Sequence, residues 1–193
     1  MKTVVFICLG LFLSACAFAG ERLALWPDGK IPNFQAQQVA ATTQELKQPG
    51  FERAEHTMPY LEWYDTPVEK NGACLLLISG GAYQNCCDGV WIDRVAKKFS
   101  ELGFVCVSLV YRTPRPQGLP IYQSGWEDGQ RAVRLVRSEA TQRGFDPDRI
   151  GALGFSAGGH LTVLLATNSL TPAYAPVDSF DEVPCHLNWA VPI

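Results

Sequence analysis

The sequence predicts an α/β domain in which helices cover both faces of a mostly parallel sheet. Short apolar runs recur along the chain, and segments with helical periodicity separate them. Continuous apolar runs are typical of strands buried on both faces, and their alternation with helices indicates a parallel sheet. The chain has 193 residues, of which 47% are hydrophobic and 18% charged, so one domain can bury a substantial core.

The expected strands are residues 73–78, 104–111, 149–154 and 187–191. Residues 61–64 are expected as an additional antiparallel strand at the edge of the sheet. Three prolines within residues 114–120 exclude regular ladder pairing there, so this stretch is expected to be an extended loop.

Three segments are expected as helices. Apolar residues recur at helical spacing over residues 90–102, and Gly103 then ends the pattern. Ser124 and Glu127 have the spacing of a capping box, which predicts a helix that runs from Ser124 to Gly144. Residues 157–168 are expected as a third, largely apolar helix.

Charge and cysteine content exclude several classes of function. The formal net charge is -3 and there is no run of Lys or Arg, so nucleic acid is not an expected partner. Seven cysteines, two of them near the N-terminus, leave an odd number and predict no disulfide framework. The Cys86-Cys87 pair has no histidine cluster or second C-x-x-C near it, so neither a metal nor another cofactor is expected.

The first twenty residues have the pattern of a secretory signal, and an exported protein is expected. Lys2 precedes an apolar run at residues 4–13, which is too short to span a membrane as a stable helix. Residues 17–19 read A-F-A, which predicts that 1–19 is a signal peptide. Alternatively, residues 13–16 resemble a bacterial lipobox, in which case 1–15 is removed and Cys16 carries a lipid that attaches the protein to a membrane. The expected location is therefore periplasmic, extracellular or lipid-anchored.

Residues 154–158 read G-F-S-A-G, which is the spacing of a nucleophile elbow. An elbow lifts a serine oxygen above the sheet on a sharp strand-to-helix turn, and it has room only for small residues two positions away. An expected strand precedes this motif directly and an expected helix follows it. The context therefore predicts Ser156 as a catalytic nucleophile.

The glycine-rich segment after the first expected strand is a candidate oxyanion hole. Acyl transfer needs amide donors where the carbonyl oxygen becomes negative. In an elbow-based site one donor is the residue after the nucleophile, here Ala157, and the other follows an earlier strand. Gly81 and Ala82 are placed to provide it. The segment lacks both common phosphate-binding glycine patterns, which makes a nucleotide site the weaker interpretation.

Beyond these motifs, the sequence resembles one family over most of the chain after residue 20. The resemblance is carried by LWPDGKIP, LLLISGGAYQ, FVCVSLVYRTP, the run from WEDGQRAVRLVRSEA to GFSAGGHL, and DSFDEVPCHLNWAVPI. These segments are similar to bacterial α/β-hydrolases grouped with acetylxylan and feruloyl esterases, which are BD-FAE-like carbohydrate esterases. The sequence departs from their pattern at Ser79, where Pro or His is usual, and at Ala82, where a third glycine is usual.

The resemblance implies an α/β-hydrolase three-layer sandwich with a mostly parallel sheet over residues 20–193. It implies hydrolysis of acetyl or related esters on carbohydrate through an acyl-enzyme on Ser156, so acylated carbohydrate or a small ester is the expected partner. A peptidase or a small-molecule carboxylesterase on the same fold is the alternative. The resemblance also implies that Asp128 and Arg131 form a pair that stabilises the fold.

None of the three histidines fits the role of general base. His56 precedes the core strands, His160 follows Ser156 on the same helix, and His186 is expected at the opposite edge of the sheet. In this fold the acid and the histidine follow the nucleophile in the chain. We therefore expect a domain that is incomplete at its C-terminus, with the last strands missing, and a chain that is nearly inactive alone.

Overall fold

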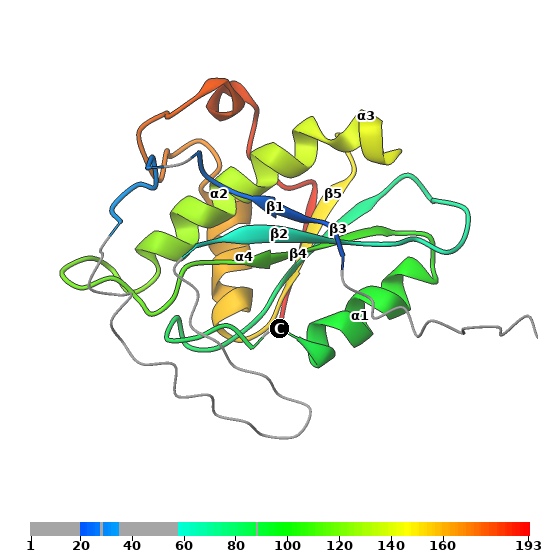
Figure 1. Cartoon of the computed structure of the whole chain (residues 1–193), viewed down its shortest axis with the longest axis horizontal. Coiled ribbons are helices and arrows are strands. Elements are labelled where there is room, and N and C mark those ends of the chain that lie inside the picture. Colours follow the sequence, from blue (N-terminus) through cyan, green and yellow to red (C-terminus); the bar gives the residue numbers. More distant parts are fainter. Residues whose placement is uncertain (1–19, 28, 35–57, 88) are drawn as a thin grey trace, which may run out of the picture.

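The computed structural model describes residues 20–27, 29–34, 58–87 and 89–193 (Figure 1). The expected signal segment with Cys16, and also His56, lie outside the described residues. One six-stranded sheet forms the centre of the molecule. Its strands are β1 (Arg22–Ala24), β2 (Tyr60–Tyr64), β3 (Cys74–Ile78), β4 (Val105–Val110), β5 (Ile150–Gly154) and β6 (Trp189–Pro192).

The strands lie in the order β1-β2-β4-β3-β5-β6. β4, β3, β5 and β6 are parallel, whereas β1 and β2 run antiparallel to their neighbours. All residues of β3, β4 and β5 are buried, which explains why these strands appear in the sequence as uninterrupted apolar runs. The expected mostly parallel sheet is therefore confirmed.

The structure corrects one expectation about the edge of the sheet. The strand expected at residues 61–64 exists as β2 and is antiparallel, but it is not an edge strand, because β1 pairs with its outer side. β1 has three residues, which is too short for a periodic apolar pattern to reveal it.

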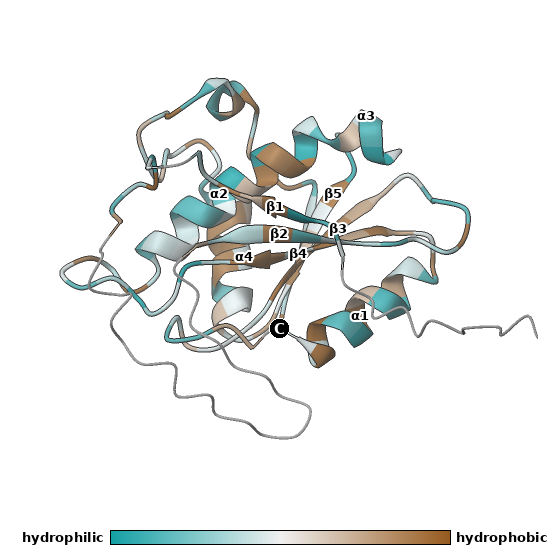
Figure 2. Cartoon of the chain, in the orientation of Figure 1, coloured by the Kyte–Doolittle hydropathy of each residue, from teal (hydrophilic) through white to brown (hydrophobic). Residues whose placement is uncertain are grey.

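Helices cover both faces of the sheet. They are α1 (Val90–Ser100), α2 (Gln123–Ser138), α3 (Ala140–Arg143) and α4 (Ala157–Thr167), and a 3-10 helix, η2 (Ser179–Glu182), lies before β6. α1 packs on one face in a small apolar cluster with Leu75 and Leu77, whereas α2 and α4 contribute to the larger cluster on the other face. Figure 1 shows α1 on one side of the sheet and α2 and α4 on the other. In Figure 2 the central strands are largely hydrophobic, whereas the turn between β2 and β3 is largely hydrophilic. None of the helices in the described ranges is long and apolar enough to span a bilayer.

The start of α2 differs from the expected capping box. The helix begins at Gln123, its cap residue Tyr122 makes no side-chain cap hydrogen bond, and the buried Ser124 hydroxyl has no hydrogen-bond partner among the residues that the structure describes. Instead, side-chain contacts fix this end of the helix. The Nε2 atom of the Gln123 side chain donates to the carboxylate of Glu127 at 2.9 Å and to the carbonyl of Ala173 at 3.0 Å. The expected stop at Gly144 is confirmed, after a break that separates α2 from α3.

A buried ionic network joins α2 to the ends of two strands. Arg112, which follows β4, donates to Glu127 at 2.7 Å and to Asp128 at 2.9 Å, and all three side chains are almost fully buried. Trp26 also donates to Asp128, at 2.8 Å. Because buried charges are tolerated only when they are paired and hydrogen-bonded, this network fixes the segment after β1 and the segment after β4 against α2.

The expected pair between Asp128 and Arg131 is wrong. Asp128 is occupied by Arg112 and Trp26, and Arg131 binds Asp178 at 2.6 Å and Asp181 at 3.1 Å. Both residues stabilise the fold, but through partners that are distant in the chain. The Arg131 hydrogen bond lowers the pKa of Asp178 below its usual value, which keeps this carboxylate charged.

Candidate active site

Ser156 occupies a sharp turn between β5, which ends at Gly154, and α4, which begins at Ala157. Its backbone has φ 54 and ψ -116, a conformation that non-glycine residues rarely adopt. The side chain is exposed, and no hydrogen bond to its hydroxyl is present among the described residues. The turn therefore presents a free serine hydroxyl at the carboxyl end of the parallel strands, where ligands bind in open α/β sheets.

The glycines of the motif are required by close backbone packing. A Cβ atom at Gly154 would lie 2.2 Å from the carbonyl oxygen of Gly158, and a Cβ atom at Gly158 would lie 2.3 Å from the carbonyl oxygen of Ile78. Both distances are far below any real carbon–oxygen contact. The G-x-S-x-G spacing in the sequence thus reflects the approach of α4 to the ends of β3 and β5.

The glycine-rich loop after β3 lies directly against the serine turn. A Cβ atom at Gly80 would be 2.9 Å from the carbonyl oxygen of Phe155 and 3.1 Å from the Cβ of Ser156. The next residues have positive φ values of 134 at Gly81 and 54 at Ala82. The two segments predicted separately from the sequence are therefore brought together through their backbones.

The three amides expected as oxyanion donors are free for a ligand. Within the described part of the chain, the backbone N–H groups of Gly81, Ala82 and Ala157 take no part in a hydrogen bond. The carbonyl groups of Gly80 and Gly81 are used differently, since they accept from residues 84, 85 and 87 and close the loop into compact turns. Such free, oriented amides beside an exposed hydroxyl form an environment that favours a developing negative charge.

A cavity of about 490 Å³ opens at Ser156. It is lined by Gly80, Gly81, Ala82, Gln84, Asn85, Cys87, Trp91, Phe155 and Ser156. Trp91 and Phe155 form an edge-to-face pair with ring centroids 4.2 Å apart, which gives the cavity one aromatic wall. A volume of this size exceeds what an acetyl group needs and leaves room for part of a larger molecule.

Two of the lining residues, Trp91 and Asn85, were not identified as site residues from the sequence. Trp91 lies in the first turn of α1 and Asn85 follows the glycine-rich loop, so both could have been proposed from their position after the loop. Cys87 is a half-buried free thiol in the cavity wall, whereas Cys86 next to it is buried and its thiol faces the carbonyl of Tyr111 at 3.3 Å. No disulfide joins the five cysteines of the described ranges.

The described histidines do not provide a general base for Ser156. His160 follows on the next turn of α4, and its Nδ1 atom is 2.9 Å from the hydroxyl of Tyr83. His186 lies in the segment before β6, where its carbonyl accepts from Arg137. Neither side chain is hydrogen-bonded to Ser156 in the described residues. The structure thus assembles the predicted nucleophile and amide donors, and His160 and His186 lie where the sequence placed them.

Two of the described acids that follow Ser156 in the chain are engaged by an arginine. Asp178 and Asp181 both form ion pairs with Arg131 on α2. Over the residues with assigned positions, no group of three or more His, Cys, Asp or Glu side chains is arranged to hold a metal ion.

Comparisons with known proteins agree with this architecture. Residues 62–182 match the BD-FAE family. The chain is 27% identical to an acetylxylan esterase of Xylanibacter ruminicola over 128 residues, which are 62% of this chain and 26% of that protein. It is 33% identical to esterase LipQ of Mycobacterium tuberculosis over 113 residues, which are 58% of this chain and 26% of that protein.

Among solved structures, the chain is similar to an acetyl ester-xyloside bifunctional hydrolase from Caldicellulosiruptor lactoaceticus. The TM-score is 0.65 and the identity 27%, over 92% of this chain and 57% of the other. The chain spans between 15% and 28% of the length of the curated relatives that it matches. The family match covers more than half of the chain and fits the sheet order, the flanking helices and the serine turn. The chain therefore belongs to the BD-FAE family and has the α/β-hydrolase fold.

Proposed function

We propose that this chain carries the nucleophile and the oxyanion hole of a serine ester hydrolase that acts on acetyl or related esters of carbohydrate. The observation that carries the proposal is the grouping of the exposed Ser156 hydroxyl with the free amides of Gly81 and Ala82 at the 490 Å³ cavity, next to the free amide of Ala157 at the start of α4. A serine with this geometry suits nucleophilic attack on a carbonyl carbon.

The proposed reaction follows from the positions of these groups. The Ser156 oxygen attacks the ester carbonyl, and the resulting oxyanion accepts hydrogen bonds from the amides of Gly81 or Ala82 and of Ala157. The tetrahedral intermediate expels the alcohol and leaves an acyl group on Ser156, which water then hydrolyses. Both steps need a general base, normally a histidine, to move the proton. The described histidines are not placed for this role, so the proposal includes a histidine and an acid that the described residues do not provide.

Two features favour an ester of carbohydrate as the substrate. Relatives of this chain include an acetylxylan esterase and an acetyl ester-xyloside hydrolase. The cavity is larger than an acetyl group requires, and its Trp91–Phe155 wall offers apolar area against which a sugar ring or an aryl group could pack. The alternative is a small-molecule carboxylesterase, which the likeness to esterase LipQ supports.

Hydrolysis of p-nitrophenyl acetate by the full-length gene product, which the proposal requires to carry the histidine and the acid, and by its Ser156→Ala variant tests the proposed activity. Turnover that depends on Ser156 is expected, and equal rates in the two proteins would reject it. Acetate release from acetylated xylan then separates the substrates. A protein that cleaves p-nitrophenyl acetate but leaves acetylated xylan untouched supports the carboxylesterase alternative.

We propose in addition that the protein is exported, on the basis of residues 1–19. Metabolic labelling with a radioactive fatty acid distinguishes the two processing routes. Label that is lost in a Cys16→Ser variant supports a lipid anchor, whereas an unlabelled, processed protein that begins at Gly20 supports an ordinary signal peptide.

A further inference from the structure

His160, on the serine helix α4, contacts the segment that contains the oxyanion loop. It is exposed on α4, one turn after Ser156, and its Nδ1 atom is 2.9 Å from the hydroxyl of Tyr83. The two rings meet edge to face, with centroids 6.0 Å apart. Residues 82 and 83 are adjacent, so this contact connects a helix residue directly to the segment that holds two of the free amides.

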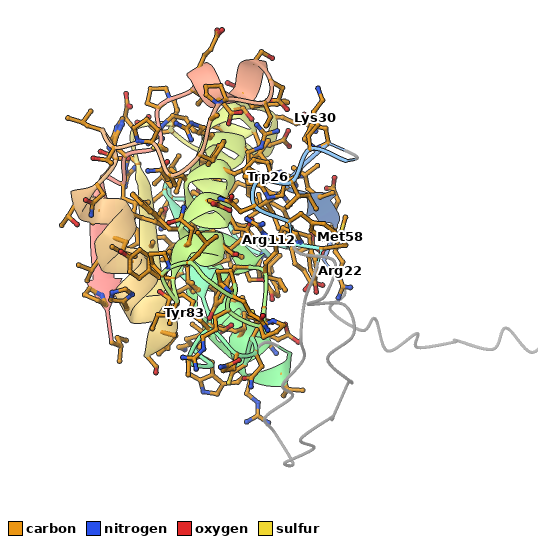
Figure 3. The ribbon with its side chains drawn as sticks, turned by 90° about the vertical axis from the view of Figure 1, so that its left-hand side faces the viewer. Arg22, Trp26, Lys30, Met58, Tyr83 and Arg112 are labelled. Atoms are coloured by element: carbon orange, nitrogen blue, oxygen red, sulfur yellow. The ribbon has the colours of Figure 1, made fainter. Side chains whose placement is uncertain are left out.

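Tyr83 is a buried anchor at the end of this loop. Only 4% of its surface is exposed, and Figure 3 shows it beside α4. Its ring lies 5.8 Å from that of Tyr111, and it fills the space that a side chain at position 125 would need, because a Cβ atom at Gly125 would be 3.1 Å from its Cε1 atom. The ring is therefore held from three sides, by α2, by the end of β4 and by α4.

The backbone of Ala82 and Tyr83 is held in an unfavourable conformation. Ala82 has φ 54 and Tyr83 has φ 58, and each non-glycine residue in this left-handed region costs about 1 kcal/mol or more. Two consecutive residues of this kind persist only where the surroundings hold them in place. Without its anchor, the loop is expected to relax toward ordinary φ values and to turn the amides of residues 81 and 82 away from Ser156.

We propose that His160 is a positioning residue, which holds the Tyr83 hydroxyl and thereby fixes the amides of Gly81 and Ala82 relative to Ser156. The expected effect of His160 on catalysis rests on the proposed function, whereas its effect on the conformation of the loop is independent of that function.

The hydrogen bond can form with either ring tautomer of His160. Burial raises the pKa of the Tyr83 phenol above its ordinary value, so the phenol keeps its proton at neutral pH and donates to an Nδ1 atom that carries no hydrogen. In the tautomer with the hydrogen on Nδ1, the Nδ1–H group donates to the phenol oxygen instead.

Four single variants and one double variant test the proposal by steady-state kinetics. Tyr83→Phe and His160→Leu remove the hydrogen bond, and His160→Asn keeps a polar atom near the position of Nδ1. Tyr122→Phe is the matched control, since the Tyr122 ring lies 5.6 Å from that of His160 but its hydroxyl makes no hydrogen bond among the described residues.

We expect kcat to fall about 10- to 100-fold in Tyr83→Phe and in His160→Leu, with KM nearly unchanged, because one oxyanion donor contributes about 100- to 1000-fold. His160→Asn should recover most of this loss, and Tyr122→Phe should match the wild type. The double variant Tyr83→Phe/His160→Leu should be no slower than the slower single variant, since both act through one contact. Losses that multiply in the double variant, or an unchanged kcat, would overturn the proposal.

Amide hydrogen exchange over residues 80–87 gives a readout that does not need activity. Exchange in this segment should be faster in Tyr83→Phe and His160→Leu than in the wild type, and normal in Tyr122→Phe. If the wild type shows no Ser156-dependent turnover, the proposed function fails and this measurement alone decides the anchor. If turnover is present but exchange is the same in all variants, the anchor is wrong and the proposed function stands.

Discussion

Replacement of Ser156 by glycine is expected to make the protein more stable than replacement by alanine. Both variants lose the hydroxyl, so neither can form the proposed acyl-enzyme. They differ in backbone freedom, because Ser156 has φ 54 and ψ -116, which glycine adopts readily and alanine does not. The hydroxyl is exposed and has no partner in the described residues, so its removal costs little by itself.

The expected size follows from two opposing terms. A residue held in such a region costs about 1–3 kcal/mol, and glycine removes this cost. Glycine also makes the unfolded chain more flexible, which lowers the free energy of unfolding by about 0.4–1 kcal/mol. We therefore expect the free energy of unfolding of Ser156→Gly to exceed that of Ser156→Ala by about 1 kcal/mol, which corresponds to a rise of about 2–4 °C in Tm for a domain of this size.

Urea unfolding followed by circular dichroism, with thermal melts in parallel, measures the difference. Ala166→Gly is the control, because Ala166 is exposed within the ordinary helical turns of α4. There glycine should lower the free energy of unfolding by about 1 kcal/mol. The decisive result is the opposite sign at the two positions. If Ser156→Gly is equal to or less stable than Ser156→Ala, the serine turn is not strained and the argument from its backbone is wrong.

Three further changes probe the network, the ion pairs and the elbow. Asp128→Asn should lower the free energy of unfolding by about 3 kcal/mol in urea titrations, because Arg112 loses one of two buried charged partners; a loss below 1 kcal/mol would contradict this. Asp178 has a lowered pKa from its Arg131 hydrogen bond, so its stabilisation is complete above about pH 4 and is lost as pH falls through the lowered pKa. Asp178→Asn should therefore flatten the dependence of stability on pH below pH 4, as acid titrations of the two proteins would reveal. Gly158→Ala should lower stability by about 2–3 kcal/mol and also reduce turnover, since its Cβ would meet the carbonyl at the end of β3 at 2.3 Å; normal stability would refute the packing argument.

The parts of the fold that the sequence predicted correctly depend on short stretches of chain. β3, β4 and β5 are fully buried, so each is a continuous apolar run. The requirement for small residues around Ser156 is also local, because Gly154 and Gly158 touch each other across one turn. Such features can be recognised without knowledge of the rest of the molecule.

The features that the sequence did not predict depend on partners far apart in the chain. Asp128 binds Trp26 and Arg112, and nothing near Asp128 in the sequence indicates either contact. The tertiary contacts of Asp128 with Arg112 and of Arg131 with Asp178 replaced the expected pair on α2. In the candidate site, the serine turn and the glycine-rich loop were both expected, but their contact and the aromatic wall of the cavity arise only when β3 and β5 become neighbours.

The contact of Gly80 with the serine turn limits how the substrate preference of the proposed ester hydrolase can change. Because the loop and the turn meet through backbone atoms, with a virtual Cβ at Gly80 only 2.9 Å from a carbonyl oxygen, neither segment has room to vary its side chains there. New preferences must arise in wall residues from other parts of the cavity, such as Trp91 and Asn85. Under the proposed function, a library that varies these two positions and keeps the loop glycines should change which esters bind while it preserves the reaction. Evolution and protein engineering are thus directed to the same small set of positions.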